Sequence, residues 1–278
     1  MDNRRRCVDT IPKIINRKLI KKRHPISYTP EQSIFTFMKT ITALLFCCIV
    51  FSCCKSQQNS IGKPVVKDTV YTFAKGSSDG IGKFYKGREI SFVMGAMGSD
   101  WLERDTRNQE ENTNAAIAAI DVPPNAVIAD IGAGTGYYSF RLAKKVPAGK
   151  VYAVDIQDEM IDLLKERKAQ LKDTVVQVIK SSIKSPNLPD NSVDLAIMVD
   201  VYHELEFPQE MLQVLKKALK PTGKILLIEY RGEDPSVPIK PLHKTTVAQL
   251  NKEFEANGFK LSYKGDFLPI QHFLLYGL

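Results

Sequence analysis

The chain has few cysteines, and none of them lies beyond residue 54. The five are Cys7, Cys47, Cys48, Cys53 and Cys54 in a chain of 278 residues. The long remainder therefore has no disulfide framework, no thiolate nucleophile and no metal site with cysteine ligands. Such a composition is compatible with either redox compartment, so it does not indicate where the protein resides.

The main part of the chain also lacks an excess of charge of one sign. The net charge is +8, but residues 1–37 hold nine Lys and Arg against three Asp and Glu and so carry +6 of it. A nucleic-acid-binding domain would need a basic face of its own. We therefore expect no nucleic-acid partner, and we interpret residues 1–37 as a disordered basic leader or a mis-assigned start.

The apolar run Ile41–Phe51 is too short to span a membrane. It has eleven residues, whereas a spanning helix needs about 20. With Met38-Lys39 before it and Val50-Phe51-Ser52-Cys53 at its end, it is typical of a bacterial lipoprotein signal. We expect residues 38–52 to be a signal peptide that starts at Met38, and Cys53 to carry the lipid that anchors the protein in the bacterial cell envelope. The alternatives are a buried segment of the main domain and a cytoplasmic protein.

Residues 53–110 are expected to form a tether and an N-terminal helical or lid segment. Lys75–Gly87 is rich in Gly and Ser and predicts a loop, and Arg104–Ala119 predicts a helix that ends before two prolines. Trp101, the only tryptophan, stands beside a run of charged residues. It is expected either to cover a binding site as part of a lid or to pack against the main domain.

From residue 111 onward, short apolar strands alternate with amphipathic helices. This alternation predicts βαβ units and a mostly parallel sheet, and two final strands with no helix between them predict an antiparallel edge. The predicted fold is α/β, a doubly wound Rossmann-like sheet of seven strands. The predicted strands are 126–132, 150–156, 174–180, 193–201, 224–230, 259–266 and 271–278, and the predicted helices are 135–146, 158–171, 208–220 and 245–258.

The stretch DIGAGTG (130–136) places three glycines directly after the first of these strands. Glycine allows a turn with positive φ and lets a ligand approach the backbone closely. The third glycine of a dinucleotide fingerprint would stand at Tyr137, which disfavours a nicotinamide-dependent oxidoreductase. Asp155 ends the second strand, where a carboxylate can bind the hydroxyls of a ribose. The loop and the acid together indicate an adenosyl ligand.

These residues resemble class I S-adenosylmethionine-dependent methyltransferases. The loop at 130–136, Asp155, and the stretches LPDNSVD (188–194) and LKPTGKILLIE (219–229) match blocks of that superfamily in the right order, particularly in its quinone-biosynthesis-like and small-molecule groups. The resemblance covers residues 111–278 and implies S-adenosylmethionine as cofactor and a small molecule as methyl acceptor. Relatives often carry an acidic residue near the adenine, where this chain has Ser182.

The resemblance also implies roles for particular residues. The residues expected to bind the cofactor are Asp130, Gly132, Gly134, Gly136, Asp155, Ile156 and Met160. Those expected to contact the substrate are Trp101, Tyr202, Glu229 and Arg231, although a salt bridge with Glu233 or Asp234 is an equal alternative for Arg231.

Asp200 and His203 are the expected catalytic residues. Asp200 would face cofactor and substrate at the end of the fourth strand, and a histidine is well suited to proton transfer near neutral pH. The alternative for His203 is a structural role at the start of a helix, as it is for His243. His203-Glu204 does not continue into the zinc motif H-E-x-x-H, because Phe207 stands at the last position. We therefore expect no metal site.

The sequence leaves two functions open. One is a methyltransferase for a small-molecule acceptor, and the other is an exported, non-catalytic lipoprotein that binds an adenosyl compound through the same fold. Export would separate the enzyme from cytoplasmic S-adenosylmethionine, which is the argument for the second. The acceptor cannot be read from the sequence.

Overall fold

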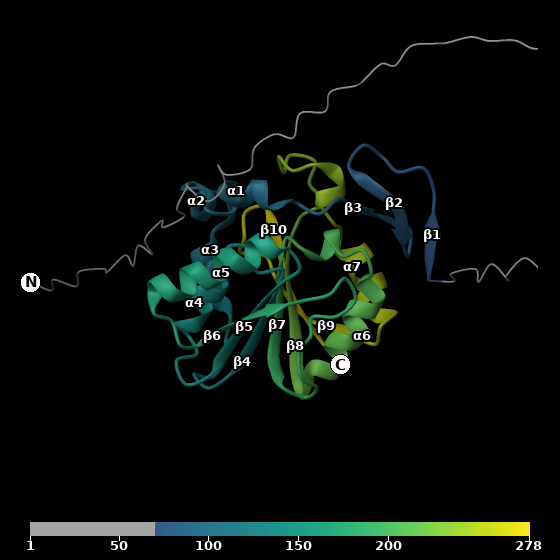
Figure 1. Ribbon diagram of the computed structural model, residues 1–278. Helices are drawn as coiled ribbons and strands as arrows, with labels where there is room; N and C mark the ends of the chain where they lie inside the picture. Colours follow the sequence, from purple (N-terminus) through teal and green to yellow (C-terminus); the bar gives the residue numbers. More distant parts are fainter. Residues whose placement is uncertain (1–69) are drawn as a thin grey trace, which may run out of the picture. The chain divides into compact units, whose positions relative to one another are not determined.

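The computed structural model describes residues 70–278, which build a seven-stranded sheet (Figure 1). The leader, the expected signal peptide and Cys53 lie outside these residues. The strands follow the order β6-β5-β4-β7-β8-β10-β9. Their bounds are β4 Val127–Ile131, β5 Lys150–Asp155, β6 Val176–Lys180, β7 Val193–Val199, β8 Leu219–Tyr230, β9 Lys260–Gly265 and β10 Gln271–Gly277.

The first five strands of this sheet in sequence order pair in parallel, and β10 pairs antiparallel with both β8 and β9. The predicted seven-stranded, mostly parallel sheet with an antiparallel edge is therefore confirmed. Every predicted strand and helix of residues 126–278 occurs, with ends that differ by a few residues. The largest difference is at β8, which begins at Leu219 because this residue pairs with Val193 ahead of an irregularity in the ladder.

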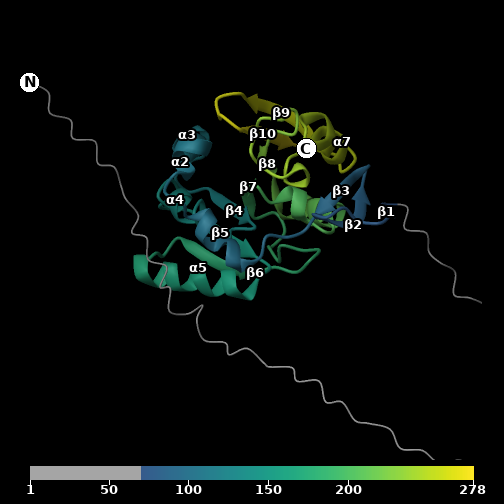
Figure 2. The ribbon, with the colours of Figure 1, turned by 90° about the horizontal axis from the view of Figure 1, so that it is seen from above.

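Helices cover both faces of the sheet. One face packs against α3 (Thr113–Ala119), α4 (Ser139–Ala143) and α5 (Asp158–Leu171), and the other against α6 (Pro208–Ala218) and α7 (Val247–Glu255). Figure 2 shows α3 and α4 on the side of the sheet opposite α7. Because successive side chains of a strand point to opposite faces, Ile128 of β4 belongs to the first core and Ala129 to the second. Burial on both faces explains why the central strands β4 and β7 are mostly apolar.

The helix ends follow from the local sequence. Pro208 opens α6 at a first-turn position, where its missing N–H is not needed for a helical hydrogen bond. Thr246 caps α7 by accepting a hydrogen bond from the backbone N–H of Gln249 at 3.1 Å.

Residues 70–111 differ from the sequence-based expectation. The predicted loop Lys75–Gly87 is wrong for its second half, since β1 (Tyr71–Phe73), β2 (Gly80–Tyr85) and β3 (Arg88–Ser91) form a separate antiparallel sheet. Lys86 and Gly87 join β2 to β3 in a tight turn, with φ of 53° and 98°. Two positive φ values are typical of a two-residue hairpin turn, and the Gly/Ser-rich composition concealed this pairing.

The helix expected over Arg104–Ala119 is also divided. Two short helices, α1 (Ser99–Leu102) and α2 (Arg107–Glu111), precede α3. Asn112, with a φ of 53°, interrupts the helical conformation between α2 and α3. Among residues 70–278, no helix has the length and apolar character needed to cross a membrane.

Candidate functional site

A cavity of about 490 Å³ lies at the carboxyl ends of the parallel strands. Residues that directly follow β4, β5, β6 and β7 line it, namely Gly132, Ile156, Ser181 and Asp200. Ligands of open α/β sheets bind at this edge, outside the carboxyl ends of the strands. The fold therefore brings together the strand-end residues that the sequence singled out.

The glycine loop forms one wall of the cavity. Gly132, Gly134 and Gly136 all have positive φ, of 71°, 55° and 80°. A Cβ on Gly132 would lie only 2.5 Å from Cγ2 of Val201, so this position has no room for a side chain. Glycine at position 132 thus lets the loop pack closely against Val201, and Gly132 and Gly134 both line the cavity.

Asp155 fixes this loop while lining the cavity. Its Oδ2 accepts a hydrogen bond from the backbone N–H of Gly134 at 2.9 Å, and its Oδ1 accepts one from the N–H of Gln157 at 2.9 Å. Burial raises the pKa of this carboxyl, although these backbone donors act in the opposite direction. Each carboxylate oxygen keeps a lone pair for a further donor, so Asp155 can bind hydroxyl groups of a ligand.

Asp130 and Gly136 stand behind the loop and do not line the cavity. Asp130 is buried and accepts a hydrogen bond from the Oγ of Ser139 at 2.6 Å. Burial raises the pKa of Asp130 to about 6. A Cβ on Gly136 would lie 2.6 Å from the ring of Phe140. Both residues therefore support the loop from the side of α4.

Asp200 lines the cavity, and one of its two carboxylate oxygens has no hydrogen-bond partner among the described residues. Its Oδ2 accepts a hydrogen bond from Nε2 of Gln271 at 2.8 Å, whereas its Oδ1 is buried and has no hydrogen-bond partner among residues 70–278. Burial raises the pKa of Asp200 well above its usual range, and the nearby Glu111 and Glu229 carboxylates raise it further. Such a buried, unpaired oxygen is suited to a cationic or hydrogen-bond-donating ligand group.

His203 lies in η2 (Tyr202–Glu204) and is held from behind by a carboxylate. Its Nδ1 is 2.6 Å from Oε2 of the fully buried Glu229. The other oxygen of Glu229 accepts backbone N–H groups of Val201 at 3.1 Å and Tyr202 at 2.7 Å. Because a carboxylate can only accept, Nδ1 of His203 carries a proton and Nε2 is left for the cavity.

The small sheet positions this histidine. Arg88 of β3 donates to the backbone carbonyl of His203 at 3.1 Å and makes a two-pronged salt bridge to Glu253 of α7, at 2.7 and 2.8 Å. Ser91 also donates to that carbonyl, at 3.3 Å. Residues 88–91 thus tie η2 to α7, a role that the sequence did not indicate.

The segment around α1 covers part of the cavity. Trp101 lines it, contacts the ring of Tyr230 with centroids 6.5 Å apart, and stays 37% exposed. The next residue but one, Glu103, accepts a hydrogen bond from Oγ1 of Thr135 in the glycine loop at 2.6 Å. Both sequence-based alternatives for Trp101 are therefore partly met, since it packs on the main domain and also faces the cavity.

Three residues expected to contact the substrate do not line the cavity. Glu229 is buried behind His203, and the Tyr202 hydroxyl donates to Glu253 at 2.8 Å inside the core. Arg231 donates to backbone carbonyls of Leu268 and Pro269, at 2.7 and 3.3 Å. By contrast, Ile156, Met160 and Ser182 do line the cavity.

Sequence reasoning missed part of the cavity wall. Val93 and Met94 follow β3, and His243 ends η3 (Pro241–His243), far from His203 along the chain. His243 could be proposed only as a helix-start residue, because no spacing pattern connects it with His203.

The sequence and the fold of the chain are similar to those of known methyltransferases. The model of a family described as "Methyltransferase domain" matches residues 122–272. The chain belongs to this methyltransferase family.

Individual relatives are distant. The chain is 25% identical over 130 residues to the 2-methoxy-6-polyprenyl-1,4-benzoquinol methylase of Caenorhabditis elegans, covering 46% of this chain and 45% of the relative. It is 26% identical over 138 residues to the demethylmenaquinone methyltransferase of Chlamydia muridarum, covering 48% and 59%. The methyltransferase described here thus spans about half the length of the curated relatives it matches.

One solved structure matches over nearly its whole length. It is a SAM dependent methyltransferase from Aquifex aeolicus, with a TM-score of 0.63 and 25% sequence identity, and the match covers 66% of this chain and 98% of that one. The expected fold and the expected membership of a methyltransferase family are therefore confirmed.

Proposed function

We propose that this methyltransferase transfers the methyl group of S-adenosylmethionine to a small, largely apolar acceptor molecule. The observation that carries the proposal is the single cavity that the glycine loop, Asp155, Asp200 and His203 share. Family membership and the match to the Aquifex aeolicus enzyme support the reaction and the cofactor.

The residues of the cavity fit this cofactor. Gly132 and Gly134 line the cavity, and Asp155 has free lone pairs for two ribose hydroxyls. The unpaired Oδ1 of Asp200 matches the ammonium group of the amino-acid portion. Ser182 lies in the wall beside Ile156, where it can serve the adenine in place of an acidic residue.

The bound cofactor would supply an electrophilic methyl group on a sulfonium whose sulfur leaves as a neutral thioether. The protein accordingly has to align the acceptor, exclude water and increase the nucleophilicity of the accepting atom. His203 is the residue we assign to this activation, because Glu229 directs its Nε2 to the cavity. Glu229 acts through His203 and is a positioning residue.

The remaining wall indicates the nature of the acceptor. Apolar side chains dominate it beyond the glycine loop: Val93, Met94, Ile183, Leu205, Met211, Pro238 and Ile239. A pocket of this kind favours an apolar body with one polar group. The matched relatives are named as quinol and menaquinone methylases, and we propose an acceptor of similar character, an apolar ring that carries a hydroxyl group.

Two measurements test the proposal. Calorimetry with S-adenosylhomocysteine should show one binding site per chain, and labelled S-adenosylmethionine should methylate apolar phenols and quinols in preference to charged amines. His203→Asn should lower kcat strongly while leaving S-adenosylhomocysteine affinity almost unchanged. Binding without methylation across the panel would favour the non-catalytic binding protein, and failure to bind the nucleoside would refute both.

We also propose that the protein is anchored to the cell envelope through a lipid on Cys53. Support comes from the sequence of residues 38–53, which lie outside the described part of the chain. Mass spectrometry of the native protein should find an acylated N-terminal Cys53. An unprocessed Met1 or Met38 form in the soluble fraction would contradict this.

A further inference from the structure

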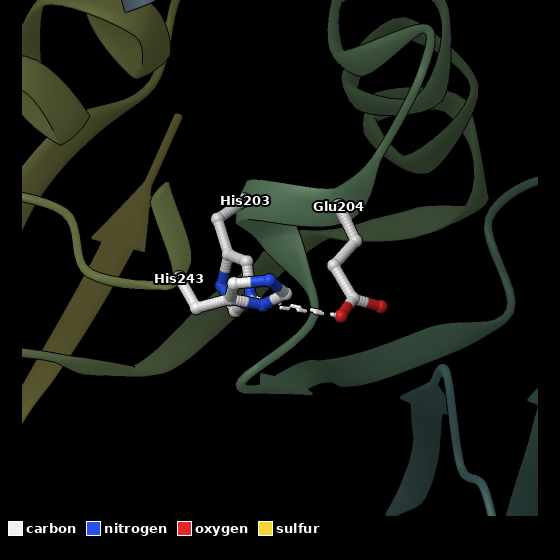
Figure 3. A group of neighbouring side chains, drawn as sticks. All are labelled: His203, Glu204 and His243. Atoms are coloured by element: carbon white, nitrogen blue, oxygen red, sulfur yellow. Dashed lines mark hydrogen bonds and ion pairs between the residues drawn. The ribbon is translucent and has the colours of Figure 1, made fainter. Parts of the chain in front are cut away.

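Three potential metal ligands meet on the wall of the cavity that contains η2 and η3. Nε2 of His203 lies 3.1 Å from Nδ1 of His243, and Oε1 of Glu204 lies 3.8 Å from the first nitrogen and 3.5 Å from the second. All three residues line the cavity, and together they form a group able to hold a metal ion (Figure 3).

Both histidines are held from behind by carboxylates. Nδ1 of His203 is 2.6 Å from Glu229, and Nε2 of His243 is 3.0 Å from Oδ2 of Asp79. A carboxylate fixes the proton of an imidazole on the nitrogen that faces it. If each ring carries only the proton on the nitrogen that faces its carboxylate, the two inner nitrogens present lone pairs to each other across 3.1 Å, and a cation between them would satisfy both.

A shared proton would satisfy the two nitrogens, but Glu204 would then make only long electrostatic contacts with the two rings. Its Oε1 stands 3.5 and 3.8 Å from the nitrogens, beyond hydrogen-bonding distance. The backbone N–H of Met94 donates to this same oxygen at 3.1 Å and fixes its place. A glutamate held at this distance from two imidazoles is arranged for a larger cation than a proton.

The separations agree with a tetrahedral metal ion. Zinc bonds of about 2.0–2.2 Å to nitrogen and oxygen place two ligand atoms about 3.4 Å apart. The three observed separations of 3.1, 3.5 and 3.8 Å lie around this value. Two histidines and one carboxylate, with an outer carboxylate on each histidine, form a ligand set known for zinc and for related divalent transition metals.

We propose that His203, Glu204 and His243 bind a divalent transition-metal ion of the zinc type. Three protein ligands leave at least one coordination position for another molecule. This replaces the sequence-based expectation that the chain has no metal site. That expectation rested on Phe207 at the end of the H-E-x-x-H pattern, whereas the third ligand comes from a segment remote in sequence.

In the proposed function, His203 acts by holding the ion. This catalytic role rests on the proposed function, whereas the binding of the metal ion does not. A bound ion would lower the pKa of an acceptor hydroxyl at the open position, so that this hydroxyl would lose its proton to the bulk solvent before methyl transfer. The oxygen then forms a bond to the methyl carbon as the bond between that carbon and sulfur breaks. Nε2 of His203 remains on the metal and takes no proton.

Cobalt(II) provides a direct test, because its visible spectrum reports the coordination geometry. The full chain is first treated with a chelator and its five cysteines are alkylated, so that thiolates outside the described residues do not bind the ion. We expect one Co²⁺ per chain with the absorption of a four- or five-coordinate site, and competition by Zn²⁺. His243→Asn and Glu204→Gln should weaken binding by more than about 100-fold, and Asp79→Asn by about 10- to 100-fold.

His272→Asn is the matched control, since this histidine also faces a carboxylate, Glu233 at 2.9 Å, but lies outside the cavity. It should leave Co²⁺ binding unchanged. Equal affinity in wild type and His243→Asn, or no binding by wild type, would overturn the metal site. Calorimetry with S-adenosylhomocysteine on the same samples checks folding and separates the two proposals. If the protein binds the nucleoside but not cobalt, the metal site is refuted and the proposed function stands. If it binds cobalt but not the nucleoside, only the metal site stands.

Discussion

Replacement of Asp155 by Ala should weaken cofactor binding and destabilise the fold by separately measurable amounts. In the free protein the carboxylate accepts two backbone hydrogen bonds, from Gly134 and Gln157, both at 2.9 Å. Leaving a buried donor unpaired costs about 1–3 kcal/mol, and the removal of a carboxyl whose pKa is raised by burial offsets part of this. We expect the free energy of unfolding to fall by about 1–2 kcal/mol.

The binding free energy of the cofactor should fall by more than the loss of this loop restraint alone would explain. Hydrogen bonds from the ribose hydroxyls to a charged acceptor contribute about 1.5–3 kcal/mol, which corresponds to a rise in Kd of about 10- to 150-fold. Calorimetry with S-adenosylhomocysteine measures the affinity, and urea unfolding measures the stability. Asp162→Ala is the control, because this side chain is 81% exposed on α5 and its change should stay within about 0.5 kcal/mol. Lower stability with unchanged affinity would show that Asp155 only fixes the glycine loop.

Three further perturbations probe the cavity and the buried carboxyl group behind the glycine loop. Asp130→Asn should flatten the pH dependence of stability. The pKa of Asp130 is about 6 in the folded protein and about 4 in the unfolded chain, so the free energy of unfolding of the wild type should fall by about 3 kcal/mol as the pH rises from 4 to above 6. The same pH dependence in both proteins would contradict this. Binding of S-adenosylmethionine should release protons, because its ammonium group favours the ionised form of Asp200, whose pKa is raised by burial. Calorimetry in buffers of different ionisation enthalpy measures this release, which should be absent in Asp200→Asn. Gly132→Ala should lower cofactor affinity at least about 10-fold, because its Cβ would lie 2.5 Å from Val201 at a φ of 71°, and equal Kd values would exclude a close approach of the ligand at this glycine.

The side of the cavity formed by the glycine loop and Asp155 could be predicted from the sequence because these residues stand at or just beyond the carboxyl ends of strands. A buried parallel strand is recognisable as a short apolar run, and the chain must turn at its carboxyl end. Gly132 and Asp155 therefore meet at one edge of the sheet without any knowledge of long-range packing. Ile156 directly follows β5, and Met160 lies in the first turn of the helix after it, so both are expected near this edge of the sheet.

The opposite side depends on contacts between segments that no local pattern relates. Asp79 comes from the loop before β2, His203 from the turn after β7, and His243 from the connection after β8. The sequence indicated that His203 would stand near the cavity, but not that a second imidazole would face it. Glu229 was placed at the correct strand end yet assigned to the substrate, because sequence alone does not reveal that His203 covers it.

The matched family region and the cavity wall do not coincide, and this bears on the acceptor. The family model begins at residue 122, whereas Val93, Met94 and Trp101 line the cavity from the preceding segment. The wall formed by the glycine loop and Asp155 thus lies inside the shared part of the chain, whereas Val93, Met94 and Trp101 add a portion of the wall from outside it. Differences in the segment before residue 122 can therefore change the acceptor without altering the cofactor site, so the names of the distant relatives support only the general character of the acceptor. The direct route to its identity is a substrate panel compared between wild type and variants of Met94 and Trp101.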